Sequence, residues 1–349
     1  MFGTESGRLT LFSLGLGPWM SARILTQFVR YMMESYKAAK TIEWDRITLA
    51  LTIVNSVAQA YLRTINAVQS VTAGGSLLVY SILSILLLET GAILTIWLAN
   101  KNKDWGIGGP SLLIAANTLD RLRKILFSGQ YQVGDSSVRI FIAVYLALIT
   151  IVVFLLEDAE LHIHVNRVMI RSTLTDDYIA IKGNPSGSMA VVYGMALYSM
   201  LGTASEFLLR LFPDGVGVVL LRVFDLNNAM GETVFIMVIW SVTVLLPLLT
   251  INPSELADRM KRNNEYTENI VPGEQTYHFM KNRILLLSVW SAFVLCALVI
   301  APFIFWTDTV GLGSIRTLPI TWFVYIGIVL RIMEEGKVYH TMQHYKAII

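Results

Sequence analysis

Long apolar runs separated by short polar segments recur along the whole chain, and each run is of the length that crosses the hydrocarbon core of a bilayer as a helix, roughly 17–25 residues. Lipid tolerates only helices and closed barrels, and these runs are too long and unbroken for barrel strands. The sequence therefore predicts an all-α polytopic membrane protein. The expected spans are nine helices, at residues 11–29, 47–66, 75–99, 111–127, 138–156, 188–211, 232–251, 284–306 and 317–333.

Composition agrees with this pattern. Of the 349 residues, 54% are hydrophobic and 15% charged, which excludes an ordinary water-soluble globular protein. The formal net charge of +2 excludes a strongly basic nucleic-acid binder. Cys296 is the single cysteine and lies in an apolar run, so an intramolecular disulfide is excluded and a packing role is expected.

The positive charges predict the orientation of the chain. Segments 30–46, 100–110, 157–187, 252–283 and the C-terminal tail, with their flanking helix ends, hold 17 of the 27 Lys and Arg residues. This set is therefore expected to be cytoplasmic, with the C-terminus inside and the N-terminus outside. The first ten residues do not resemble a signal peptide, so we expect a preceding span that this chain lacks.

Two cytoplasmic segments, 157–187 and 252–283, are far longer than a helix connection requires, and long loops usually carry function. In the first, LHIHVNRVMI alternates apolar and polar residues and YIAIKGNPSG follows a turn-like TLTDD, which predicts a β-hairpin. The second opens at Asn252-Pro253 with a helical ELADRMKRNN and breaks at Pro272-Gly273. Both loops are candidate docking surfaces.

Four stretches together resemble one family. They are FSLGLGPWMSARILTQ (Phe12 to Gln27), TGAILTIWL with the following Gly106-Ile107-Gly108, the hairpin that ends in IAIKGNPSG, and INPSELADRMK with VPGEQT (Val271 to Thr276). In this order they resemble the SecY family of protein-conducting channels, and the departures are most like the accessory SecY of Gram-positive bacteria. The family has ten spans, so the nine expected here would be its second to tenth.

The resemblance implies a single membrane domain over residues 1–349, built as a channel of two pseudo-symmetric halves. Residues 1–10 would be the plug. The gate would involve Pro18, which is expected to kink its helix, together with Gln27 and Asn184. By register, the apolar pore ring falls on Leu16, Met20, Ile114, Thr118, Val192 and Tyr325. Such a constriction excludes water and ions but yields to a passing chain, and Thr118 is more polar than the family pattern.

By the same resemblance, the two long loops would dock a motor ATPase, SecA, or a ribosome. Residues available for this contact are Arg167, Arg171, Lys182, Arg259, Lys261, Arg262 and Glu274, each of which is also consistent with a solvated face or a lipid anchor. Leu161 and His162 stand where the family has a basic pair, and Val271 stands where it has an arginine. These losses favour a dedicated accessory SecA, small accessory subunits, and serine-rich glycoprotein adhesins as exported substrates.

One alternative remains open. Glu89 lies in the apolar run LLLETGAIL, and such a carboxylate would suit a proton-coupled transporter of small solutes. Arg23 and Glu206 are the other intramembrane ionisable candidates. The pairs His162/His164 and His340/His344 have metal-compatible spacing but no third ligand nearby in sequence, so we interpret them as surface histidines. HExxH, GxSxG and GxxxxGK[ST] motifs are absent, so neither an enzyme nor a cofactor is expected.

Overall fold

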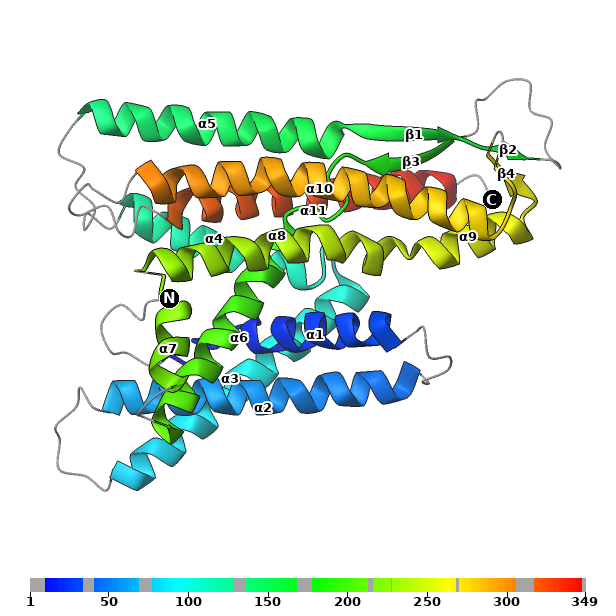
Figure 1. Ribbon diagram of the computed structural model, residues 1–349. Coiled ribbons are helices and arrows are strands. Elements are labelled where there is room, and N and C mark those ends of the chain that lie inside the picture. The colour runs from blue at the N-terminus through cyan, green and yellow to red at the C-terminus, as the bar shows by residue number, and fades with distance from the viewer. Residues whose placement is uncertain are drawn as a thin grey trace. The chain divides into compact units, whose positions relative to one another are not determined.

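The computed structural model describes residues 10–33, 41–68, 77–127, 136–167, 178–212, 216–226, 228–267, 270–305 and 317–346. Most of these residues are helical (Figure 1). Each predicted span corresponds to one long helix: α1 (Gly17–Met33), α2 (Thr41–Val68), α3 (Leu77–Trp105), α4 (Pro110–Phe127), α5 (Ser136–Asp158), α6 (Met189–Leu211), α8 (Ala229–Ile251), α10 (Glu274–Phe305) and α11 (Leu318–Lys346). Two shorter helices were not predicted as spans, α7 (Val216–Val223) and α9 (Pro253–Arg262).

The number of membrane spans is only partly tested by helix length and composition. Within the described residues, four helical stretches are long and apolar enough to cross a membrane: Leu78–Trp105, Arg139–Asp158, Ala229–Arg262 and Glu274–Leu298. The all-helical membrane fold is therefore supported, and the count of nine spans stays a prediction.

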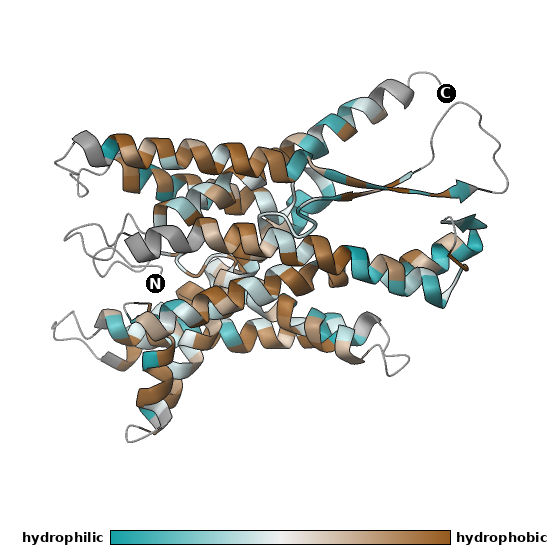
Figure 2. Ribbon diagram, turned by 45° about the horizontal axis from the view of Figure 1, so that its top comes forward, coloured by the Kyte–Doolittle hydropathy of each residue, from teal (hydrophilic) through white to brown (hydrophobic). Residues whose placement is uncertain are grey.

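Several helices extend beyond the apolar runs that predicted them. Helix α10 begins at Glu274, ten residues before the expected start at 284, directly after Gly273 with its positive φ of 118°. Helix α11 continues from the apolar run to Lys346 through a charged segment. Figure 2 shows the hydrophobic residues along the middle of the long helices and hydrophilic residues toward their ends. The apolar run thus marks the part in lipid, whereas the helix continues into water.

The start of α1 corrects one prediction. The chain from Thr10 to Leu16 forms turns, with Gly15 at a φ of 57°, and the helix begins only at Gly17. Pro18 therefore lies in the first turn, where the missing N–H would have no intrahelical acceptor anyway. The expectation that Pro18 kinks the interior of a span is wrong.

The chain forms two compact units, each made of segments from both halves of the sequence. Unit 1 holds residues 1–116, 192–238 and 331–349, and unit 2 holds residues 117–191 and 239–330. In unit 1, α1 and α3 both pack against α2. Leu14, Ala60, Leu88 and Ala92 form a buried apolar cluster there. Gly91 of α3 lies directly against the backbone of Leu11, so only a residue without a Cβ fits.

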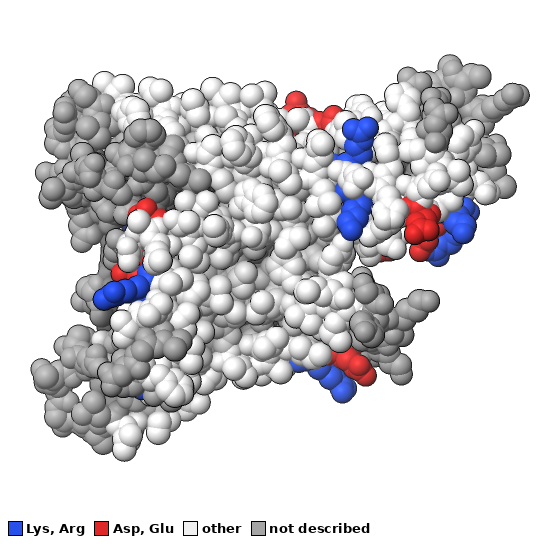
Figure 3. Space-filling model, in the orientation of Figure 1, with Lys and Arg blue, Asp and Glu red and all other residues white. Residues whose placement is uncertain are grey.

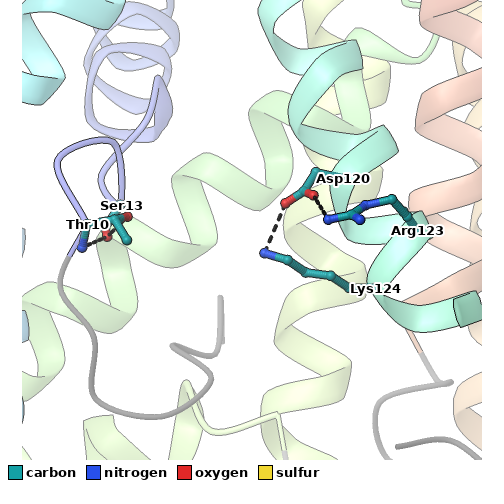
Figure 4. Close-up of polar contacts among 5 residues, drawn as sticks. All are labelled: Thr10, Ser13, Asp120, Arg123 and Lys124. Carbon is teal, nitrogen blue, oxygen red and sulfur yellow. Dashed lines mark hydrogen bonds and ion pairs between the residues drawn. The ribbon is translucent and has the colours of Figure 1, made fainter. Parts of the chain in front are cut away.

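The core of unit 2 joins α4, α5 and α11. Leu122 and Leu318 are buried, and Leu146, Trp322 and Tyr325 are among the side chains that pack on them. The Trp322 indole N–H donates to Thr150 Oγ1 over 3.0 Å, which satisfies a polar group that lipid could not. At the exposed end of α4, Asp120 accepts from Arg123 and Lys124 over 3.2 and 2.9 Å (Figure 4).

The predicted β-hairpin is present in unit 2. Strand β1 (Glu160–His164) pairs antiparallel with β3 (Tyr178–Lys182), with Glu160 opposite Lys182 and His164 opposite Tyr178. Ile163 and Ile181 are buried, and His162 and His164 are exposed, as the alternating pattern predicts. Helix α5 ends two residues before β1, so the hairpin extends directly from a membrane helix.

Candidate functional site

The two long loops that were predicted to be docking surfaces are joined to each other. Strand β2 (Asn166–Arg167) from the first loop pairs antiparallel with β4 (Glu265–Tyr266) from the second. Asn166 lies opposite Tyr266, and Arg167 lies opposite Glu265. No periodicity in the sequence marks these two-residue strands, because a pairing this short and this distant depends on the tertiary structure. The loops therefore form one connected structure.

Helix α9 carries most of the exposed positive charge of this structure. Its buried side, which includes Leu256, Ala257 and Met260, follows helical spacing, and the helix packs against α10 and β4. Three predicted docking residues are exposed on it: Arg259, Lys261 and Arg262. They occupy the last turn, where positive charge is favourable beside the helix dipole. In Figure 3, Lys and Arg side chains gather with acidic side chains near α9, while the apolar length of α10 is uncharged.

The other predicted docking residues have different environments. Lys182 Nζ lies 3.7 Å from the largely buried Glu157 Oε2, so its charge is partly compensated. Glu274 is exposed in the first turn of α10. The backbone of Arg167 belongs to β2, whereas its side chain and the whole of Arg171 lie outside the described residues.

The predicted pore-ring residues divide between the two units. Leu16, Met20, Ile114 and Val192 belong to unit 1, and all four are buried, with exposed fractions of 4 to 8%. Thr118 and Tyr325 belong to unit 2 and are half-buried, and Tyr325 packs on the core cluster of that unit. Four of the six positions are thus apolar side chains withdrawn from the surface of one unit.

The predicted gate residues are held by local hydrogen bonds. The Pro18 carbonyl accepts from Ser21 Oγ over 3.0 Å and from Asn55 Nδ2 over 3.3 Å. Asn184 is buried, and its Oδ1 accepts from Ser186 Oγ and from the Gly187 N–H, which closes the turn before α6. Gln27 is half-buried in α1.

The predicted plug falls almost entirely on residues 1–9, which lie outside the described part of the chain. Thr10 is described: its N–H donates to Ser13 Oγ over 2.9 Å and the two hydroxyls lie 2.7 Å apart (Figure 4). Ser13 in turn uses its carbonyl to accept from the Arg63 guanidinium of α2. The segment that follows the predicted plug is therefore fixed to unit 1.

A polar network between α1, α2 and α3 was not predicted. Asn55 Nδ2 donates to Ser21 Oγ over 2.7 Å, and Gln59 Nε2 donates to Asn55 Oδ1 over 3.3 Å. One turn away, Ser56 Oγ donates to Glu89 Oε1 over 2.7 Å. The sequence signal was available, since Asn55 and Gln59 are polar residues four apart in a span, but their partners were not evident. Glu89 is thus half-buried and hydrogen-bonded to a neighbouring helix.

The competing candidate sites have ordinary surroundings. The Arg23 guanidinium lies over the Trp19 ring, 5.1 Å from its centroid, and Glu206 is exposed on α6. His162 stacks on Tyr178 with ring centroids 4.0 Å apart and lies 3.3 Å from Glu160 Oε2. Among the described residues, no group of three or more His, Cys, Asp or Glu side chains could hold a metal ion.

Comparison with known proteins gives one consistent family. A family model described as SecY matches residues 10–333. The accessory Sec system protein translocase subunit SecY2 of Leuconostoc gelidum subsp. gasicomitatum is 26% identical, with 99% of this chain and 85% of that protein covered. The protein of the same name from Staphylococcus epidermidis is 27% identical, covering 99% and 86%.

The fold also matches solved structures. A SecY structure, described in a study of how the plug domain stabilises the closed translocation channel, superposes with a TM-score of 0.64 at 17% identity and covers 96% of this chain and 84% of that one. A second, described as a protein-conducting channel, gives a TM-score of 0.62 at 18% identity. At these identities the likeness shows a common fold, with the long helices in corresponding order.

Proposed function

The chain belongs to the SecY family, and from this membership we propose that it is the central channel subunit of a protein-export translocase, passing unfolded polypeptides across the cytoplasmic membrane. The observation that carries the proposal is the match of the SecY model to residues 10–333, together with relatives named as translocase subunits over nearly the whole chain. Members of this family are multi-pass proteins of the cytoplasmic membrane and form a non-enzymatic pore, so energy comes from a partner.

We assign the chain to a dedicated accessory system, driven by an accessory SecA and supplied with serine-rich glycoprotein adhesins. The names of the relatives support the accessory assignment. Leu161, His162 and Val271 stand at positions that are basic in the general family, and an uncharged docking surface there favours a dedicated motor. Small accessory subunits complete the translocase.

The pore ring is assigned to Leu16, Met20, Ile114, Thr118, Val192 and Tyr325. The burial of the four members in unit 1 supports this assignment, because side chains that close a narrow pore are withdrawn from lipid and from bulk water. Met20 suits such a position since its flexible, polarizable side chain adapts to many shapes. Residues 1–10 act as the plug, and α1 with the turn at Asn184 forms the gate.

The cytoplasmic motor docks on the connected loops. The exposed Arg259, Lys261 and Arg262 of α9 and the antiparallel pairing of β2 with β4 support this surface, since they present a charged helix on a fixed base. The C-terminal end of α11 lies on the same side of the membrane, in agreement with the distribution of positive charge.

Site-specific crosslinking to an arrested export chain tests the channel. A photoreactive residue at Met20 or Val192 should form adducts with the arrested polypeptide in membranes that also carry the motor. Leu86 and Phe293 are exposed by 61% and 66% and serve as lipid-facing controls, which should form no such adducts. A folded, arrested complex without adducts from either pore position would contradict the proposal.

Charge reversal tests the docking surface separately. Lys261→Glu combined with Arg262→Glu should weaken motor binding about tenfold or more, because two attractive charges become repulsive. Arg123→Glu is the matched control, since Arg123 is an exposed helical arginine on α4 outside the loops. Equal motor affinity for the docking variant and the control would exclude α9 as the contact.

A further inference from the structure

A cavity of about 300 Å³ lies where the hairpin meets the N-terminal part of α10, entirely within unit 2. Strand β1 contributes Leu161, His162, Ile163 and His164, and the second loop and α10 contribute Thr267, Phe279 and Arg283. Its volume is at the lower end of the range that holds small ligands, roughly 300–1,000 Å³. Neither the docking surface on α9 nor the pore ring uses these residues.

The lining combines hydrogen-bond donors with an apolar wall. Arg283 is exposed, its guanidinium lies over the Phe279 ring at 5.2 Å from the centroid, and within the described residues no carboxylate pairs with it. Thr267 Oγ1 is buried and has no hydrogen-bond partner among the residues that the structure describes. A buried hydroxyl without a partner is costly, so a bound acceptor at this point would be favourable.

The charges at the cavity favour an anion. Arg283 supplies a permanent positive charge with several donors in a planar fork, which matches the oxygens of a phosphate. His164 adds ring nitrogens. The nearest acid on β1, Glu160, is held at His162 on the hairpin. A phosphate oxygen could therefore accept from both Arg283 and Thr267 without facing an unpaired carboxylate among the lining residues.

The position of the cavity along α10 identifies the source of the phosphate. From Ile284 to Phe305 no residue is charged, so Arg283 is the last charged residue before the stretch that crosses the hydrocarbon core. Phe279 lies about one helical turn further out, at the depth of the headgroups. Long cationic side chains at such a boundary reach toward lipid phosphates.

We propose that this cavity, lined by His164, Thr267, Phe279 and Arg283, is a binding site for the phosphate headgroup of an anionic phospholipid. The phosphate accepts from Arg283 and Thr267, and the glycerol portion lies against Phe279 and Ile163. Because this lipid would occupy the base of the hairpin beside α10, it would hold the connected loops at a fixed height above the bilayer. The inference depends on the chain being a membrane protein and is independent of what the channel conducts.

The test is lipid binding to the full chain, solubilised in detergent and titrated with phosphatidylglycerol or phosphatidylcholine, with bound lipids counted by native mass spectrometry. The expected result is one tightly bound phosphatidylglycerol, with about tenfold weaker binding in Arg283→Gln. Thr267→Val should also weaken it, by several-fold. Lys281→Gln is the matched control: Lys281 lies on the same helix, over the Tyr277 ring, and does not line the cavity.

Further arms separate the alternatives. Equal weakening by Lys281→Gln would show a diffuse charge effect and overturn the site, as would unchanged binding in Arg283→Gln. Displacement of the lipid by millimolar glycerol 3-phosphate or inorganic phosphate would show that a soluble phosphate is the ligand, and displacement by an acidic peptide would show a protein ligand. Melting temperatures of the variants within a few degrees of the parent chain exclude loss of folding as the cause.

Discussion

Ser56 of α2 donates a hydrogen bond of 2.7 Å to Glu89 of α3, so the carboxylate in the middle of an apolar helix is held by a neighbouring helix. The second oxygen, Oε2, is buried and has no hydrogen-bond partner among the described residues. Helix-to-helix hydrogen bonds in membranes contribute modestly, on average about 0.6 kcal/mol. This contact therefore links α2 to α3 without by itself indicating a transport site.

Glu89→Gln distinguishes a channel from a small-solute transporter. The amide keeps an oxygen for Ser56 Oγ, so we expect polypeptide export to remain within about twofold of the unmodified protein. A proton-coupled transporter would instead lose its coupled uptake with this carboxylate. Secretion of a reporter polypeptide and solute uptake in the same cells measure both, and abolished export with intact folding would contradict the expectation. Ser56→Ala should cost about 0.5–1.5 kcal/mol of stability.

Gly91→Ala should strongly destabilise unit 1. A Cβ at Gly91 would lie 1.8 Å from the Leu11 carbonyl oxygen, so the α1 entry segment or α3 must move. We expect a loss of about 1–3 kcal/mol, measured by thermal unfolding in detergent. Gly202→Ala is the matched control, because its Cβ would meet nothing within 4 Å and an interior helical glycine gains by becoming alanine. Similar melting temperatures for the two variants would show that α3 does not approach Leu11 this closely.

Asn252 should be replaceable by glycine and not by alanine. It caps α9 with a φ of 45°, in the left-handed region, while its side chain accepts from the Glu255 N–H only at 3.5 Å. Because that bond is long, the backbone conformation should dominate, so Asn252→Ala costs about 1 kcal/mol and Asn252→Gly a few tenths. Hydrogen exchange of the α9 amides measures the difference. Faster exchange in the glycine variant as well would assign the effect to the side-chain bond.

Disulfide crosslinking tests the pairing of the two loops. In a Cys296→Ser background, Asn166→Cys with Tyr266→Cys should oxidise readily, because these residues lie opposite each other in the β2–β4 ladder. Asn166→Cys with Asn263→Cys is the displaced control and should oxidise much more slowly. Peptide mapping after proteolysis between the loops gives the yield. If the displaced pair oxidised equally fast, the loops would not hold this register.

Much of the helical architecture could be predicted from the sequence, because lipid forces every apolar run of sufficient length into a helix. The run that includes Glu89 became α3 and the alternation at His162 and His164 became a strand facing β3, since both patterns reflect burial on a fixed period. The family could also be predicted, because its motifs lie in order along the chain. Helix ends were less predictable: Pro18 begins α1 and does not bend it, since the turn at Gly15 delays the helix.

Only the tertiary structure decided which polar groups meet. The sequence shows Asn55, Ser56 and Glu89 as isolated polar residues in apolar runs, but the packing of α1 and α3 on α2 decides that Asn55 bonds Ser21 and that Ser56 bonds Glu89. The joining of the loops through β2 and β4, and the cavity between Thr267 and Arg283, arise in the same way. Hydrophobic periodicity is a local property that one segment carries alone, whereas a hydrogen bond or a cavity requires two segments far apart in the chain to be placed together.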